Sequence, residues 1–198
     1  MTDLNMLLFA AINAPTDPSA ASIALAEFFA DRLIWIVPLG LVASWLWGRE
    51  PLKRSALAAA FSGLLALAVA QLISINYYHA RPFAIGVGHT FIPHVADSSF
   101  PSDHGTLMAA VGTSLLMRRQ SRLLGCALLV CWFPMAWARV YLGVHFPADL
   151  VGAALVGAGA AVAVQRFDRV TVGPAYGPIK QVYRRVLRPL ITRGWIQP

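Results

Sequence analysis

The chain has 198 residues, of which 58% are hydrophobic and only 13% are charged, and its net charge is +7. Soluble domains carry roughly 25% charged residues, so the composition excludes a disordered chain, a collagen-like fibre and a disulfide scaffold, and it argues against a soluble enzyme. One membrane span uses about 20 apolar residues. We therefore predict an all-α, polytopic helical membrane bundle of five to six membrane segments. In such a protein the basic residues indicate the orientation of the spans in the membrane and do not indicate a nucleic-acid partner.

The chain is predicted to form a single membrane domain over residues 1–198, without a repeat or a long linker. Residues 1–18 contain a short apolar segment, 3–14, which is too short to cross the membrane and is expected to lie in the interface or to re-enter. The transmembrane bundle occupies 19–168, and a basic amphipathic cytoplasmic tail follows at 169–198. The first 31 residues contain no Lys or Arg, so no cleavable signal peptide is expected.

Five spans are predicted within the bundle, at residues 23–47, 56–77, 106–117, 123–137 and 147–164. Pro38 predicts a kink in the first span. In the last span, the small residues Ala153 and Gly157 stand four positions apart and predict close helix packing. A sixth span would require residues 3–14 to cross, whereas the absence of early basic residues favours five spans with an outer N-terminus.

The two cysteines, Cys126 and Cys131, lie in one apolar run. Five positions apart on a helix, their side chains point in different directions. We therefore expect core or lipid-facing residues, and neither a disulfide nor a metal site.

If the spans alternate in direction, 13 of the 16 Lys and Arg residues fall on one side. These residues are Arg49, Lys53, Arg54, Arg118, Arg119, Arg122, Arg166, Arg169, Lys180, Arg184, Arg185, Arg188 and Arg193. The positive-inside rule makes this side cytoplasmic and predicts a cytoplasmic C-terminus. All five histidines fall on the other, outer side, namely His79, His89, His94, His104 and His145. Scattered structural histidines would not collect on one face.

In the tail, apolar residues recur at helical spacing from Ile179 to Ile191, with basic residues between them. This pattern predicts a basic helix on the anionic cytoplasmic leaflet. Pro189 interrupts the pattern, so a frayed tail is the alternative.

Three outer segments hold polar residues, and each charged one would cost about 2.5–3.5 kcal/mol near the centre of the hydrocarbon. They are Arg81-Pro82, Pro101-Ser102-Asp103-His104 and the stretch from Arg139 to Asp149. Because each segment lies at a span end on the same side, the fold can bring the three together. Two guanidinium groups then face two imidazoles and one carboxylate.

That set of groups suits phosphoryl transfer. The guanidinium groups of Arg81 and Arg139 can bind phosphate oxygens in pairs and spread the charge of the transition state. Free amides at the start of the third span, together with Ser102, add donors for an anion.

His145 and Asp149 stand four positions apart where Pro147 begins a helix, so they can share a face. Asp149 can then accept the proton of one ring nitrogen and leave the other nitrogen free to attack phosphorus. His104 opens the third span and can protonate the departing group. Each segment alone would be chance or helix capping, but order, spacing and side agree for all three.

The three segments, with the spacing Arg139-x5-His145-x3-Asp149, resemble the signatures of the type-2 phosphatidic acid phosphatase superfamily. The stretch from His79 to His104, with Gly88-His89-Thr90 and Asp97-Ser98-Ser99-Phe100, resembles its bacitracin-resistance branch, the undecaprenyl-diphosphate phosphatases. The likeness extends from near the N-terminus to Arg193-Gly194-Trp195.

This resemblance implies hydrolysis without metal or cofactor through a phosphohistidine, with His145 as the nucleophile and His104 as the acid. It also implies a multi-pass protein of the bacterial inner membrane with an outer-face site that faces the periplasm. This site would act on undecaprenyl diphosphate, the membrane lipid carrier of cell-wall synthesis, and recycle it to undecaprenyl phosphate. Bacitracin resistance is an expected consequence.

The sequence departs from the superfamily pattern at two main positions. Ser74 stands where the first signature has a lysine, seven positions before Arg81. We hypothesise that Arg32, the outer basic residue outside the motifs, replaces this cation. A local ion pair of Arg32 with Glu27 or Asp31 is the alternative.

The second departure is Asp103, where the superfamily usually has glycine; Ala138 is a lesser one, where serine is usual. The carboxylate of Asp103 is expected to raise the pKa of the neighbouring His104 and keep it protonated. Helix N-capping by Asp103 is the alternative.

The remaining histidines have less specific interpretations. The spacing of His89 and His94 from His104 matches no usual metal pattern, so loop positions at the mouth of the pocket are favoured over metal ligation. His79, beside Arg81, either contacts the distal phosphate or merely sits at the interface.

The motif core does not choose between a diphosphate and a monoester, so the substrate prediction depends on the resemblance to one branch. A lipid monophosphate has a second pKa of about 6 and leaves more easily than an alkoxide. Alternative substrates are phosphatidic acid, phosphatidylglycerol phosphate and a lipid A phosphate. A non-catalytic lipid-phosphate transporter is the alternative from another class.

Overall fold

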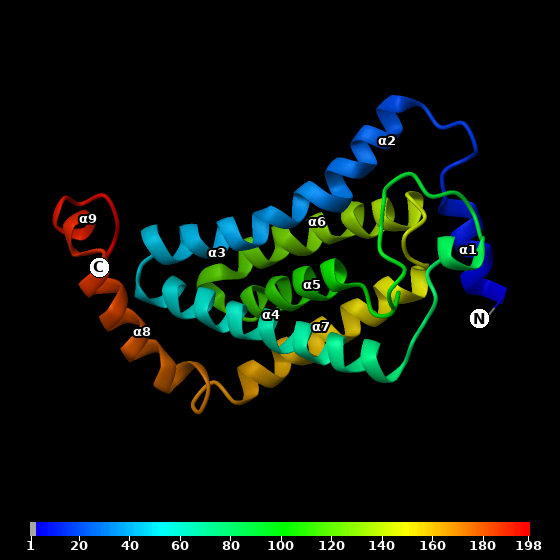
Figure 1. The fold of residues 1–198 in the computed structure, drawn as a ribbon. Helices are drawn as coiled ribbons and strands as arrows, with labels where there is room; N and C mark the ends of the chain where they lie inside the picture. Colours follow the sequence, from blue (N-terminus) through cyan, green and yellow to red (C-terminus); the bar gives the residue numbers. More distant parts are fainter. Residues whose placement is uncertain (1–2) are drawn as a thin grey trace.

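The computed structural model describes residues 3–198, and every regular element among them is a helix (Figure 1). In chain order the elements are α1 (Asp3–Ile12), α2 (Ala20–Glu27), η1 (Phe28–Arg32), η2 (Leu33–Trp35), α3 (Ile36–Trp47), α4 (Glu50–Asn76), η3 (Phe83–Ile85), α5 (Asp103–Leu116), η4 (Arg119–Ser121), α6 (Arg122–Tyr141), α7 (Pro147–Arg166), α8 (Val172–Val186) and α9 (Arg188–Thr192). The predicted all-α bundle is confirmed.

Three helical stretches are long and apolar enough to cross a membrane: Glu50–Asn76, Arg119–Tyr141 and Pro147–Arg166. They correspond to the second, fourth and fifth predicted spans. The first predicted span is a composite of α2, η1, η2 and α3, and the third is α5. Cys126 and Cys131 on α6 are both free cysteines, as the sequence predicts.

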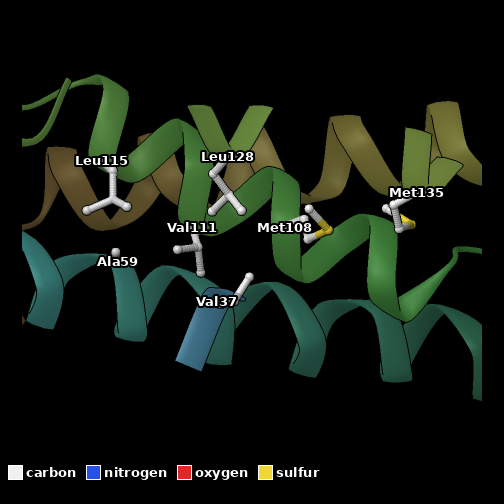
Figure 2. Close-up of a cluster of buried hydrophobic side chains, with 7 residues drawn as sticks. All are labelled: Val37, Ala59, Met108, Val111, Leu115, Leu128 and Met135. Atoms are coloured by element: carbon white, nitrogen blue, oxygen red, sulfur yellow. The ribbon is translucent and has the colours of Figure 1, made fainter. Parts of the chain in front are cut away.

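Helix α5 lies in the middle of the bundle, packed against α4, α6 and α7 (Figure 1). It has 14 residues, which corresponds to about 21 Å at 1.5 Å per residue, less than the roughly 30 Å of a hydrocarbon core. Its apolar side chains join those of α3, α4 and α6 in one buried cluster of Val37, Ala59, Met108, Val111, Leu115, Leu128 and Met135 (Figure 2). This packing fixes the position of the polar residues at the start of α5.

The first predicted span is interrupted earlier than expected. The helix changes to a π-helical turn at Phe28–Arg32 and to a 3-10 turn at Leu33–Trp35, directly before the α-helix that contains Pro38. Pro38 has no backbone N–H to donate to the carbonyl of Ile34, which leaves the turn before it without that α-helical bond. The helix therefore changes geometry on the N-terminal side of the proline.

The loops that carry most basic residues meet at one end of the bundle. Arg118, after α5, pairs with Asp168, after α7. The amide of Gln120 donates to the carbonyl oxygen of Pro51, at 3.1 Å, at the start of α4. These contacts show that the loops after α3, α5 and α7 share one end, as alternating spans require.

Helix α1 lies at the opposite end, beside the loop between α6 and α7 (Figure 1). Its Asn5 side chain accepts a hydrogen bond of 3.0 Å from the backbone N–H of Ala148. Phe9 is buried against Phe146, with ring centroids 5.1 Å apart. The ten residues of α1 thus cover the end of the bundle instead of running through it.

The tail is folded, and the alternative of a frayed tail is wrong. It forms α8 and α9, which separate at Leu187, two residues before Pro189. The segment after α9 returns to the basic end, where the buried amino group of Lys53 donates to the carbonyl oxygens of Gln197 and Pro198, each at 2.8 Å.

Small residues bring α5 and α7 together, as the spacing of Ala153 and Gly157 predicts. A Cβ on Gly157 would lie 2.6 Å from the carbonyl oxygen of Thr106 and 2.7 Å from the backbone nitrogen of Ala110. Ala153 itself is fully buried. Backbone atoms cannot yield as a flexible side chain can, so only glycine fits at position 157.

We expect Gly157→Ala to destabilise the bundle by about 1–3 kcal/mol, because the added methyl group forces α5 and α7 apart. Thermal unfolding of the detergent-solubilised protein measures this effect. Gly159→Ala is the matched control, because a Cβ at Gly159 has nothing within 4 Å. Equal unfolding temperatures for the two variants would contradict the packing described here.

Candidate active site

A tight turn between α6 and α7 places His145 inside the bundle. Gly143 in this turn has a φ of +78°, and a Cβ there would lie 2.1 Å from the carbonyl oxygen of His89. The backbone N–H groups of Val144 and His145 both point back to the carbonyl oxygen of Arg139, at 3.1 and 3.4 Å. The chain therefore turns sharply, and the side chain of His145 is buried with only 2% of the residue exposed.

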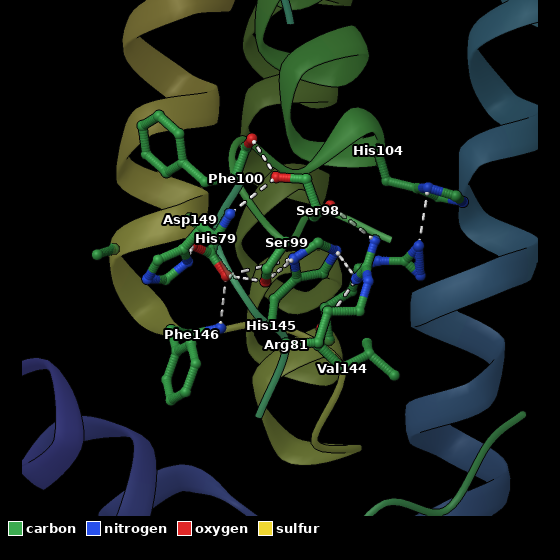
Figure 3. Close-up of polar contacts among 12 residues, drawn as sticks. His79, Arg81, Ser98, Ser99, Phe100, His104, Val144, His145, Phe146 and Asp149 are labelled. Carbon is green, nitrogen blue, oxygen red and sulfur yellow. Dashed lines mark hydrogen bonds and ion pairs between the residues drawn. The ribbon is translucent and has the colours of Figure 1, made fainter. Parts of the chain in front are cut away.

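Asp149 orients this imidazole from the first turn of α7. Its Oδ2 lies 3.5 Å from Nδ1 of His145 and accepts a 2.8 Å hydrogen bond from the backbone N–H of Phe146. The hydroxyl of Ser99 also donates to Oδ2 and lies 3.3 Å from the same Nδ1 (Figure 3). The Nδ1 edge of the ring is therefore occupied, and the Nε2 edge faces the other way.

The neighbouring guanidinium indicates which ring nitrogen of His145 carries the proton. Nη1 of Arg81 lies 3.2 Å from Nε2 of His145, and a guanidinium only donates. Nε2 must therefore present its lone pair, so the ring proton is on Nδ1, toward Asp149. Burial, with the charges of Arg139 and Arg81, lowers the pKa of His145 to about 4 against the opposing effect of Asp149, so the ring is neutral at pH 7.

All three nitrogens of the Arg81 guanidinium donate hydrogen bonds that hold it in place. Nη1 donates to the carbonyl oxygen of Val144 at 2.9 Å, and Nη2 donates to that of Ser98 at 3.3 Å. Nε pairs with the exposed carboxylate of Asp97 at 2.8 Å. A phosphoryl group that approaches Nε2 of His145 would therefore meet a guanidinium already in position.

Arg139, the second guanidinium, connects His104 to the first span. Its Nη2 lies 2.9 Å from Nδ1 of His104, and its Nη1 donates to Oδ1 of Asp31 at 3.3 Å. Because Arg139 only donates, Nδ1 of His104 is an acceptor, and the ring is neutral with its proton on Nε2. The expectation that Asp103 keeps His104 protonated is therefore wrong. His104 makes no direct contact with His145 among the hydrogen bonds of the described chain.

The start of α5 supplies anion donors. The hydroxyl of Ser102 is buried without a hydrogen-bond partner within residues 3–198, and so is Nε of Arg139. The first backbone N–H groups of a helix also lack acceptors within it. These unpaired donors lie on two of the three predicted segments, and a bound phosphate would satisfy them.

Two expectations about charged residues are corrected. Asp103 begins α5 but makes no capping bond, and it lines a polar pocket of about 290 Å³ together with Arg81 and Ser74. Arg32 is exposed and pairs with neither Glu27 nor Asp31, within the described chain. The local ion pair predicted as an alternative is wrong, because Asp31 binds Arg139 instead.

The other three histidines occupy different places around the site. His89 lies beside the segment after α1, with its Nε2 3.3 Å from the hydroxyl of Thr16. The ring centroid of His94 is 6.4 Å from that of His145, and burial lowers the pKa of His94. His79 lies beside Asp149, with 3.3 Å between Nδ1 and Oδ1. Within residues 3–198, no group of three or more His, Cys, Asp or Glu side chains is arranged to hold a metal ion.

Sequence reasoning missed three residues that hold the site together: Asp31, Asp97 and Ser99. Asp31 is an acidic residue within a predicted span, which by itself indicates a functional contact, but it was considered only as a partner for Arg32. Asp97 and Ser99 belong to a stretch that was used only for its resemblance to one branch. Nothing in their spacing pointed to Arg81 or Asp149.

The whole site lies within the part of the chain that matches the PAP2 superfamily, residues 55–170, except for Asp31. The chain belongs to this superfamily, and it is a membrane protein with a helical phosphatase fold.

Its curated relatives include YbjG of Escherichia coli (strain K12), named as an undecaprenyl-diphosphatase, with 34% identity over 197 residues, 100% of this chain and 99% of YbjG. The undecaprenyl-diphosphatase BcrC of Bacillus subtilis is 32% identical over 153 residues, 77% of this chain and 78% of BcrC. The crystal structure of LpxE from Aquifex aeolicus shares the fold, with a TM-score of 0.70 and 21% identity over 83% of this chain and 96% of LpxE.

Removal of the Asp31 carboxylate is expected to lower kcat/KM about fivefold, because Arg139 loses a charged partner that is itself half exposed to solvent. Phosphate-release kinetics of Asp31→Ala on the natural substrate measure this. Asp17→Ala is the control, because Asp17 is exposed and makes no ion pair in the described chain. If both variants kept the wild-type rate, Asp31 would have no part in positioning Arg139.

Proposed function

We propose that this protein hydrolyses undecaprenyl diphosphate to undecaprenyl phosphate and inorganic phosphate at the periplasmic face of the bacterial inner membrane. The observation that carries this proposal is the Nε2 of His145, which presents a lone pair beside Arg81 while Asp149 and Ser99 occupy Nδ1. The relatives named above supply the substrate class, because two of them carry the name of this activity over most of the chain.

In the first step, the lone pair of Nε2 attacks the terminal phosphorus and the bond from phosphorus to the bridging oxygen breaks. Undecaprenyl phosphate departs as an anion, and the Nε2–H of His104 can donate a hydrogen bond to the leaving oxygen. His145 now carries the phosphoryl group and a positive charge, which the carboxylate of Asp149 stabilises. The guanidinium groups of Arg81 and Arg139 neutralise the charge on the phosphoryl oxygens.

In the second step, a water molecule attacks the phosphohistidine and the bond from phosphorus to Nε2 breaks. Both protons of the water stay on the inorganic phosphate, which leaves as the dihydrogen anion, and His145 returns to its neutral form. The site returns to its starting state, so neither a metal ion nor a cofactor is needed to balance the reaction. A diphosphate substrate also releases a stable lipid monophosphate, which requires little help from the acid.

The surroundings of the site suit a substrate that stays in the bilayer. The polar pocket beside Arg81 is bordered by Ser74 and Ile75 near the end of α4. Ile75 and Leu72 on the same helix are mostly exposed, as expected for side chains that face lipid. The isoprenoid chain can therefore remain along α4 while the diphosphate enters the pocket.

The distribution of charge supports an outer-face site. The basic residues of the loops after α3, α5 and α7 lie at the end of the bundle away from His145, and the positive-inside rule places that end in the cytoplasm. The basic tail, with α8 and α9, lies at the same end (Figure 1). Hydrolysis on the outer side would return the lipid carrier to use and reduce the undecaprenyl diphosphate available to bacitracin.

Purified wild-type protein should release inorganic phosphate from undecaprenyl diphosphate in the presence of a chelator. His145→Ala should reduce kcat by at least about 10³-fold, because it removes the nucleophile. Parallel assays on phosphatidic acid and phosphatidylglycerol phosphate compare kcat/KM between substrate classes.

The same assay separates an enzyme from a transporter. Binding of the lipid without release of phosphate by the wild type would support a transporter and overturn the proposal. A higher kcat/KM on a monoester would keep the chemistry but reassign the substrate, and loss of activity with the chelator would overturn the metal-free mechanism.

A further inference from the structure

His79 lies outside the three motif segments, yet its backbone is fixed against the loop that carries Ser99. Its N–H donates to the hydroxyl of Ser98 at 3.2 Å, and its carbonyl oxygen accepts from the N–H of Ser99 at 2.7 Å. The imidazole is nearly parallel to the ring of Tyr77 and meets the ring of Phe146 edge-on, with centroids 6.4 and 5.8 Å away. The orientation of the His79 ring is therefore set by its surroundings.

This ring presents Nδ1 to the second oxygen of the carboxylate that orients His145. Asp149 is completely buried, and its Oδ2 already serves Phe146, Ser99 and His145. Oδ1 of Asp149 and Nδ1 of His79 lie 3.3 Å apart. Both atoms are buried, and neither has a well-aligned hydrogen-bond partner in the described chain. Figure 3 shows the carboxylate between the rings of His79 and His145.

We propose that His79 is a positioning residue: its Nδ1–H holds Oδ1 of Asp149 and so keeps Oδ2 directed at His145. This inference rests on the proposed function, because it assigns His79 a part in the phosphohistidine reaction. A buried carboxylate oxygen without a donor is unfavourable, and the carboxylate can relieve this by rotating. A donor on each oxygen fixes the plane of the carboxylate, and a small adjustment of either side chain aligns the bond.

The consequence for catalysis is specific. If Asp149 rotates, Nδ1 of His145 loses its acceptor, and the share of rings with a free lone pair on Nε2 falls. The step that suffers is the attack on phosphorus, so kcat decreases while KM changes little. Direct binding of the distal phosphate by His79 would have the opposite signature, a raised KM.

Three substitutions test separately the Nδ1 donor of His79 and the aromatic contacts of its ring. His79→Asn places an amide N–H near the position of Nδ1 but removes the aromatic contacts. His79→Phe keeps the contacts with Tyr77, Phe100 and Phe146 but has no donor. His79→Gln places its amide near the position of Nε2 instead, and it is expected to behave as His79→Phe does.

The test is phosphate release from undecaprenyl diphosphate by the purified full-length variants, with thermal unfolding measured in parallel. We expect His79→Phe to lower kcat by about 10- to 100-fold, the usual range for loss of a partner that orients an active group, with KM within about threefold. His79→Asn should stay within about threefold of the wild type in both constants. His89→Leu is the control, because the ring of His89 contacts Thr16 and not Asp149.

A wild-type kcat for His79→Phe, an equal loss in the Asn and Phe variants, or a raised KM with unchanged kcat would each overturn the role of His79. A lowered unfolding temperature in His79→Asn alone, with its kcat retained, would still support it, because packing and rate would then be separated. The proposed function fails on a different result, namely full activity of His145→Ala. If His145→Ala is inactive while all the His79 variants keep the wild-type kcat, only this inference is overturned.

Discussion

The fixed carboxylate of Asp149 is the interaction on which the rest of the site depends. It is fully buried at the start of α7, where it meets one backbone N–H, the hydroxyl of Ser99 and the imidazoles of His145 and His79. Such a group is tolerated in a membrane bundle only when donors surround it. By fixing Nδ1 of His145, Asp149 turns Nε2 toward Arg81, and the reaction proposed for the site follows from that orientation.

The packing of the helix bundle fixes the positions of the short polar segments at the ends of its helices. Helix α5 is enclosed by its neighbours and approaches α7 through Gly157, so Ser102 and His104 lie at a fixed distance from the first turn of α7. The π-helical turn in the first span places Asp31 against Arg139. π-helical turns within α-helices are frequent at functional sites, and here the turn carries the ion-pair partner of Arg139.

Hydropathy and charge predicted the helical class, the five segments and the gathering of the histidines, because these depend on one-dimensional patterns. The three motif segments converge because each lies at a span end on one side. The partners of Arg139 and Arg81 could not be predicted, since they depend on how separate helices rotate against one another. Asp31 and Arg32 are adjacent in sequence, so a local ion pair between them was a reasonable expectation. In the folded chain Asp31 instead pairs with Arg139, over 100 positions away.

The central claim is that the lone pair on Nε2 of His145 takes up the phosphoryl group. Rapid acid-free quenching of purified protein mixed with undecaprenyl diphosphate, followed by peptide mass spectrometry, locates the covalent phosphate directly. The account predicts a phosphoryl group on His145 that is labile to acid and stable to base, and that is absent from Asp149→Ala within the same quench time. A phosphoryl group on another residue, or turnover of the substrate without any phosphoenzyme under conditions that trap it, would contradict the account.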